Sequence, residues 1–180
     1  MTKFQAPEGK TALKEQLSVS YHKNFWQEFA TTYVNDKEVV RWLFEFMLEG
    51  TDRLSQTCAE IIRHMSDINR SVVTPFVDEL LDALDSNRHD AVKRCTFRMF
   101  QYATFTEEQS GRVVEAAFRH LQNRSNAIAI RVFAMTTIYN VSKTYPELYE
   151  ELVACISENL NEESAGFKNR AGKIINRKWK

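Results

Sequence analysis

The chain has 180 residues, and its 24 basic side chains balance its 24 acidic ones. A chain of this length can bury its own core without disulfides or a structural metal, and the absence of net charge excludes a global attraction to nucleic acid or to anionic membranes. No window approaches the roughly 20 apolar residues of a membrane span, and the first residues lack a signal-like apolar run, so we expect a cytoplasmic protein without membrane contact.

The amino-terminal part divides into a leader and a cap. Residues 1–10, which include a proline and a glycine, are predicted to be a flexible leader. In residues 11–35 the sequence predicts a short helix and then a longer one, because the apolar residues between Phe25 and Tyr33 fall on one helical stripe. We interpret 11–35 as an amino-terminal helical cap, since the end units of stacked arrays are usually atypical.

From Asp36 onward two kinds of helix alternate. The first kind has apolar residues at relative positions 0, +3, +4 and +7, which lie on one face of an α-helix. The fourth copy keeps this spacing until Asn159 breaks it. The four sets are Val39, Trp42, Leu43 and Phe46; Val77, Leu80, Leu81 and Leu84; Val114, Ala117, Phe118 and Leu121; and Leu152, Cys155 and Ile156.

The second kind of helix carries a repeated motif: an apolar residue, a base, two spacers, a small residue, and another apolar residue eight positions after the first. The motif starts at Leu54, Val92, Ile130 and Phe167, so its copies are 38, 38 and 37 residues apart. The small positions, where neighbouring helices could approach closely, are Cys58, Thr96, Ala134 and Ala171. The predicted unit is a helical hairpin, and such hairpins bury both apolar stripes only by stacking.

This motif, in a two-helix unit of about this length, resembles the HEAT repeat and its armadillo relatives over about residues 36–178. The resemblance implies an all-α fold, an α-solenoid of about four hairpins behind the helical cap. We expect one domain over 11–180, with repeats at about 36–69, 70–105, 106–144 and 145–180. The resemblance also implies that the second helices line a concave face.

A second resemblance concerns activity. The segments VFAMTTIYNVSKTYPEL and SAGFKNRAGKII are similar to those of short bacterial HEAT-like proteins labelled adenylosuccinate lyase, which implies a lyase-related activity. The sequence contains no serine-rich loop of the type S-S-x-M-P-x-K-x-N that such lyases use. It also lacks a glycine-rich phosphate loop and the G-x-S-x-G and H-E-x-x-H motifs. The leading prediction is a protein that is not an enzyme and binds no cofactor.

The charges are segregated between the two kinds of helix. First-kind segments (36–49, 71–86, 106–123 and 146–160) total −11, and second-kind segments (52–68, 88–104, 125–143 and 162–180) total +8. We therefore expect a basic concave face that binds a protein or peptide partner of acidic character. The alternative is that the bases are scattered and only solvate the helices. The candidate binding residues are Lys93, Arg94, Arg98, Arg131, Lys168, Arg170 and Lys173.

The base of the repeated motif has a structural interpretation too. In HEAT-like stacks a base at the position of Lys93, Arg131 and Lys168 joins a ladder with an acidic or amide residue near the preceding turn. The first copy has Ser55 there instead of a base. The residues at the expected partner positions are Glu49, Asn87, Ser125 and Glu162.

A nucleic-acid partner is the second hypothesis, because HEAT-like DNA glycosylases for alkylated bases use a basic groove of this kind. Their activity needs aromatic side chains in the groove and an acid near the lesion. Phe97, Tyr102 and Tyr139 are the candidate aromatics, and we place no acid beside them.

The cysteines and histidines point to no metal site. Three cysteines far apart in the sequence are predicted to be reduced and to pack in the core: Cys58, Cys95 and Cys155. The histidines stand alone, without the spacing of metal ligands, at His22, His64, His89 and His120. Trp179 is expected to fold back onto the core, and the alternative is that it stacks on a base or a peptide.

Overall fold

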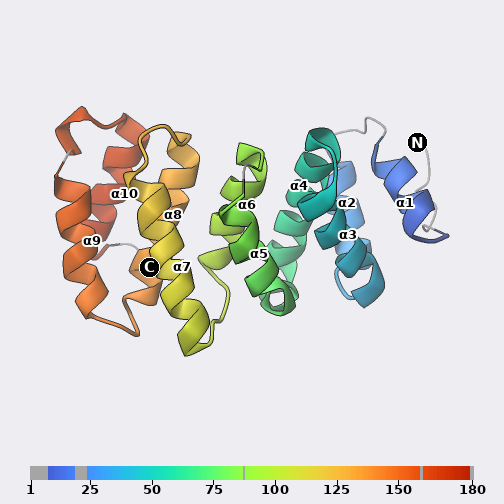
Figure 1. The fold of residues 1–180 in the computed structure, drawn as a ribbon, viewed down its shortest axis with the longest axis horizontal. Helices are drawn as coiled ribbons and strands as arrows, with labels where there is room; N and C mark the ends of the chain where they lie inside the picture. The colour runs from blue at the N-terminus through green and yellow to red at the C-terminus, as the bar shows by residue number, and fades with distance from the viewer. Residues whose placement is uncertain (1–7, 19–23, 87, 159, 179–180) are drawn as a thin grey trace. The chain divides into compact units, whose positions relative to one another are not determined.

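The computed structural model describes residues 8–18, 24–86, 88–158 and 160–178. Within these ranges it has ten α-helices, three short 3-10 helices and no strand, so the all-α prediction is confirmed. The helices form two compact units, residues 1–73 and 74–180 (Figure 1). The predictions of a single domain and of its repeat boundaries stay predictions. None of the described helices combines the length and apolarity needed to cross a membrane.

Unit 1 contains the cap and one hairpin. Its helices are α1 (Lys10–Leu17), α2 (Phe25–Tyr33), α3 (Lys37–Glu49) and α4 (Asp52–Ile68), followed by the 3-10 turn η1 (Arg70–Val72). The two helices predicted before residue 35 are α1 and α2, although α1 begins inside the predicted leader, most of which lies outside the described residues. Helix α4 packs against the three others, so it forms the centre of this unit.

Two local signals fix the ends of α3. The Asp36 carboxylate accepts hydrogen bonds of 3.1 Å from the backbone amides of Glu38 and Val39, which caps the first turn. At the other end, a Cβ at Gly50 would overlap the Phe46 carbonyl oxygen, so glycine alone leaves room for the close approach that ends the helix. The chain then turns directly into α4.

Unit 2 is a series of three hairpins. The first joins η2 (Thr74–Phe76) and α5 (Val77–Leu84) to α6 (Asp90–Phe100), and the second joins α7 (Glu107–Gln122) to α8 (Ile128–Val141). The third joins α9 (Glu147–Ser157) through η3 (Leu160–Glu162) to α10 (Ala165–Ile175). Helix α8 packs against α6 on one side and α10 on the other. We call the helices α6, α8 and α10 the inner row.

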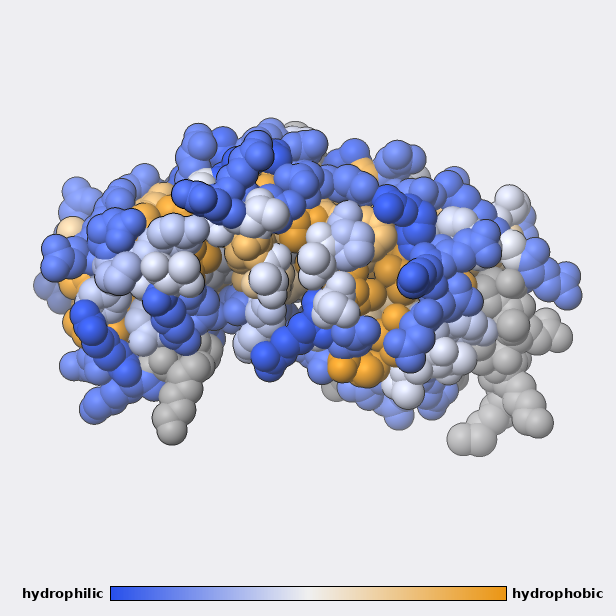
Figure 2. Space-filling view, turned by 90° about the horizontal axis from the view of Figure 1, so that it is seen from below, coloured by the Kyte–Doolittle hydropathy of each residue, from blue (hydrophilic) through white to orange (hydrophobic). Residues whose placement is uncertain are grey.

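The repeated motif marks the helix contacts of both units. Its apolar starts are at most 3% exposed, and its small residues, Cys58, Thr96, Ala134 and Ala171, are all fully buried. These positions therefore lie in the core, and the close approach of helices at them stays a prediction. On the face of the molecule in Figure 2, hydrophilic residues predominate and hydrophobic ones appear in smaller areas between them.

The apolar stripes of the first-kind helices are buried less completely than their pattern predicts. In α5 all four stripe residues are buried. In α7 two of them, Val114 and Phe118, are only half-buried, and in α9 the same holds for Cys155. Two other residues of α7, Val113 and Ala116, are buried instead. Part of the α7 stripe therefore does not pack into the core.

Candidate functional site

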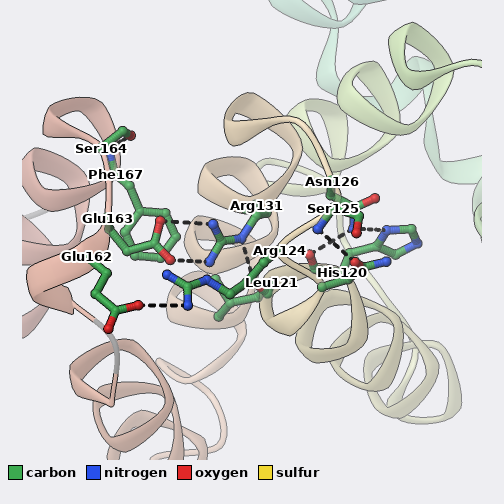
Figure 3. A network of polar contacts seen from close by, with 11 residues as sticks. His120, Leu121, Arg124, Ser125, Asn126, Arg131, Glu162, Glu163, Ser164 and Phe167 are labelled. Carbon is green, nitrogen blue, oxygen red and sulfur yellow. Dashed lines mark hydrogen bonds and ion pairs between the residues drawn. The ribbon is translucent and has the colours of Figure 1, made fainter.

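The most extensive buried polar contact of unit 2 surrounds Arg131 in α8 (Figure 3). Its Nε donates a 2.9 Å hydrogen bond to the Leu121 carbonyl oxygen at the end of α7. Its two terminal nitrogens donate to the two carboxylate oxygens of Glu163, at 2.9 and 2.6 Å. The guanidinium carbon lies 4.7 Å from the centre of the Phe167 ring. One side chain therefore connects the hairpin α7–α8 to the segment that enters α10.

The Arg131–Glu163 pair is shielded from solvent, with 8% and 7% of the two side chains exposed. Hydrogen bonds from Arg131 hold the pKa of the Glu163 carboxyl below its ordinary value, although burial acts in the opposite direction. A charge buried in this way is tolerated only when its oppositely charged partner is present, so the loss of either residue would destabilise the fold. The pair therefore fixes how the third hairpin stacks on the second.

The residue at the motif's base position has a common task in three of the four copies. Ser55 donates to the Gly50 carbonyl oxygen (3.1 Å), and Lys168 donates to that of Asn161 (2.9 Å). Arg131 does the same with Leu121. Each satisfies a backbone carbonyl group at or after the end of the preceding helix, where no helical partner remains. In the second copy, the Nζ of Lys93 lies 3.9 Å from the Oδ1 of Asp90 in the same helix.

Two of the side-chain partners predicted for this ladder are wrong. Arg131 pairs with Glu163 of the following hairpin and not with Ser125. Lys168 bonds to the Asn161 carbonyl oxygen, and its predicted partner Glu162 is held by the exposed Arg124 at 2.9 Å. Backbone carbonyl groups take the place expected for side chains in the preceding turn. The predicted partner Asn87 lies outside the described residues.

His120 forms a second connection, between the hairpins α5–α6 and α7–α8. Its Nε2 donates to the Leu84 carbonyl oxygen (3.3 Å) and its Nδ1 accepts from Asn126 Nδ2 (3.1 Å), which assigns the ring proton to Nε2. Its ring meets the Phe97 ring edge-on, with the centroids 5.2 Å apart. Burial lowers the pKa of this imidazole.

A half-buried arginine lies across the inner row. The Arg170 guanidinium of α10 donates a hydrogen bond to the Thr136 hydroxyl of α8. Burial lowers the pKa of Arg170, and the nearby Tyr102 hydroxyl acts in the opposite direction. Tyr102 follows α6 and is 48% exposed. These contacts connect side chains from all three inner-row hairpins, from the buried Thr136 to the exposed Tyr102.

The other predicted binding residues occupy different environments. On α6, Lys93, Arg94 and Arg98 are half-buried, and on α10, Lys168 and Lys173 are exposed. Arg131 is buried in the Glu163 pair and Lys168 bonds to its own hairpin. The structure thus gives three of the seven residues, Arg131, Lys168 and Arg170, hydrogen bonds within or between the hairpins.

Two of the three aromatic residues proposed for a nucleic-acid groove lie in the core. Phe97 is fully buried and packs edge-on against Phe100, and Tyr139 is 8% exposed and packs against Tyr149. Only Tyr102 is available to a ligand at the surface. The set predicted from the sequence is therefore wrong for Phe97 and Tyr139, because both follow the helical period of the buried face.

Helices α5 and α7 are joined by exposed ion pairs that the sequence did not indicate. Arg112 bonds to Asp78 (2.8 Å) and to Asp82 (2.7 Å), and Arg119 bonds to Asp85. The acidic charge of α5 is thereby compensated by bases of α7. Each such pair contributes little to stability by itself, since exposed ion pairs are worth about 0–1 kcal/mol.

The described residues contain no group of three or more histidines, cysteines and carboxylates that could hold a metal ion. Cys58 and Cys95 are reduced and buried, as predicted, and Cys155 is reduced but half-buried. The predictions for His22 and Trp179 concern positions outside the described ranges.

Comparison with known proteins agrees with the hairpin series. A family model described as HEAT repeat domain matches residues 13–177, nearly the whole chain. Searches of curated proteins and of solved structures gave no significant match. HEAT repeats generally mediate protein interactions and are typically non-catalytic. With its stacked hairpins, its motif at a period of 37 or 38 residues and this match, the chain belongs to the HEAT repeat family.

Proposed function

We propose that this protein is an interaction scaffold whose inner row binds an acidic segment of a partner protein. The observation that carries the proposal is the charge of three helices packed in series. Helices α6, α8 and α10 contain seven bases and a single acid, Asp90. A surface with this excess of positive charge attracts and orients carboxylates.

Six of the seven bases of the inner row divide into two groups in this proposal, and Lys93, which lies near Asp90, belongs to neither. Arg131 and Lys168 hold the hairpins, as their hydrogen bonds indicate. Arg94, Arg98 and Lys173 supply the contacts to the partner, together with Arg170, which also bonds to Thr136 of α8. Guanidinium groups suit this task because their planar donors match a carboxylate with two parallel hydrogen bonds. Tyr102, exposed beside Arg170, adds an aromatic surface for the partner's side chains.

Binding of a fluorescein-labelled Glu-rich peptide, measured by fluorescence anisotropy, tests the proposal. The double variant Arg94→Glu, Arg98→Glu is expected to weaken binding at least about tenfold, because reversed charges repel the peptide. The matched control is Arg124→Glu, Lys143→Glu, which changes the net charge equally but lies outside the inner-row helices. Its affinity is expected to stay within about twofold of the wild type.

Equal weakening in both double variants would contradict the assignment of the site to the inner row. A second titration with a short duplex DNA separates the proposal from the nucleic-acid alternative. Tight DNA binding whose affinity falls steeply with salt, together with no peptide binding, would replace the acidic protein partner by nucleic acid. Circular dichroism of each variant shows whether the helices are intact.

A further inference from the structure

The first-kind helices of unit 2 are α5, α7 and α9, and the seam between α5 and α7 differs from the seam between α7 and α9. Helix α5 packs against α7, and their seam is closed by the ion pairs of Arg112 and Arg119 with three aspartates. Among the described helices, α7 packs closely against α5 and α8, and α9 packs closely against α8 and α10. Helices α7 and α9 do not pack closely against each other. The seam between α7 and α9 is therefore less closely packed, and we call it the open seam, although a side-chain hydrogen bond between Gln122 and Cys155 crosses it.

Two adjoining depressions of about 700 and 200 Å³ follow this open seam, and Val114 lines both. We call their combined extent the α7–α9 groove. Its apolar lining includes Val114 and Phe118 of α7 and Leu148 of α9. All three are half-buried, so the α7 stripe that does not enter the core faces this groove. Gly111 adds a position without a side chain to its lining.

The rims of the groove carry like charges. Helix α7 contributes Glu107 and Glu115, and α9 contributes Glu147 and Glu151. Within the described residues none of these four carboxylates makes an ion pair. The base that lines the groove, Arg119, is already paired with Asp85 on the other side of α7. Four unpaired carboxylates that flank an apolar floor favour a cationic and apolar occupant.

We propose that the α7–α9 groove binds an amphipathic helix of a partner protein, with an apolar stripe flanked by lysines or arginines. Helix α7 spans Glu107–Gln122, and at about 1.5 Å per residue it offers a track of roughly 24 Å, or four helical turns. The apolar stripe would cover Val114, Phe118 and Leu148, and the basic flanks would meet the rim glutamates. This site is separate from the inner row and selects the opposite charge.

The test uses the full chain and a synthetic helical peptide in which a leucine stripe is flanked by lysines. Anisotropy of the labelled peptide is expected to show binding, whereas a peptide with glutamates in place of the lysines does not bind. The variant Glu115→Lys, Glu151→Lys is expected to weaken binding at least about tenfold, because it reverses the charge of both rims. Leu148→Ser is expected to weaken it too, by removing apolar contact.

The matched control is Glu108→Lys, Glu150→Lys, which changes charge equally on the same two helices at exposed positions that do not line the groove. Unchanged binding in the control supports the groove. Equal loss in both double variants, or retained binding in Glu115→Lys, Glu151→Lys, would overturn the proposal. Arg94→Glu, Arg98→Glu is expected to leave this peptide's affinity undiminished, which keeps the two sites distinguishable.

Discussion

The guanidinium of Arg131 and the carboxylate of Glu163 share two hydrogen bonds of 2.9 and 2.6 Å, and both side chains are more than nine-tenths buried. The two residues come from consecutive hairpins, so their contact determines the register in which α9–α10 stacks on α7–α8. Burying two charges costs free energy that only the intact pair offsets.

Removal of one partner is therefore expected to destabilise the protein strongly. Arg131→Met leaves the Glu163 carboxylate buried without its partner, and we expect a loss of about 3–5 kcal/mol in the free energy of unfolding. Urea unfolding followed by circular dichroism measures it. The double variant Arg131→Met, Glu163→Leu is expected to recover most of the loss, because no uncompensated charge remains.

The neighbouring exposed pair provides the control for this prediction. Arg124 and Glu162 bond at 2.9 Å with about half or more of each side chain exposed. Arg124→Met is expected to change the free energy of unfolding by at most about 1 kcal/mol. A similar cost for both single variants would mean that burial is not what makes the Arg131 pair important.

Acidification is expected to weaken unit 2 through His120. Burial lowers the pKa of this imidazole, helped by Arg119 and Lys93 and opposed by Asp85 and the Leu84 carbonyl bond. The folded state therefore favours the neutral ring. The stability that this preference contributes is fully present above the unfolded pKa of 6.5 and declines as the pH falls below that value. Hydrogen exchange of the α7 and α8 amides from about pH 7 to pH 5 should show this loss.

His120→Gln separates this contribution from other titrating groups. The variant has no imidazole, so its stability should change less than that of the wild type over the same pH range. Parallel pH profiles for the two proteins would show that another group causes the acid sensitivity.

The helix caps of unit 1 give a matched pair for a third prediction. Asp36 accepts two backbone hydrogen bonds at the start of α3, whereas Thr51, at the same position of α4, makes no side-chain cap bond. Asp36→Ala is expected to cost about 0.5–2 kcal/mol, and Thr51→Ala much less. Thermal unfolding of both variants tests the difference. Equal costs would show that a property other than the cap bond decides these helix starts.

The small position of the third motif copy should not tolerate a large side chain. Ala134 is fully buried in α8, the helix that contacts both neighbours of the inner row. Ala134→Phe is expected to destabilise by about 1–3 kcal/mol through overpacking. Ala165→Phe, at an exposed position of α10, is the control. A thermal melt that Ala134→Phe leaves unchanged would contradict the close approach of helices there.

The sequence predicted the hairpins and the buried motif because both depend on a short periodic pattern. Ile130 and Ala134 lie on the face of α8 that packs against neighbouring helices, so their spacing in the sequence was sufficient to predict their burial. The partner of Arg131 was missed because a long side chain can reach either way along the stack. The available signal was Glu163, an acid four positions before the motif start at Phe167.

The charge pattern had a similar limit. The summed charge of α7 does not show on which side of the helix each charged residue lies. Arg112 turns toward α5, whereas Glu115 lines the seam with α9. The predicted stripe of α7 likewise assumed that every apolar residue has a neighbour to pack against. Val114 and Phe118 are half-buried because no helix fills the space above them, which periodicity alone does not reveal.

The distances along the chain that these contacts span have a mechanical consequence. The side-chain hydrogen bonds described between hairpins of unit 2 join residues 30 to 40 positions apart, as from Arg112 to Asp82 and from Thr137 to Phe97. None of them ties a hairpin to any but its neighbour. Under a stretching force, hairpins should therefore detach one after another, and the extension should increase in steps of about one repeat.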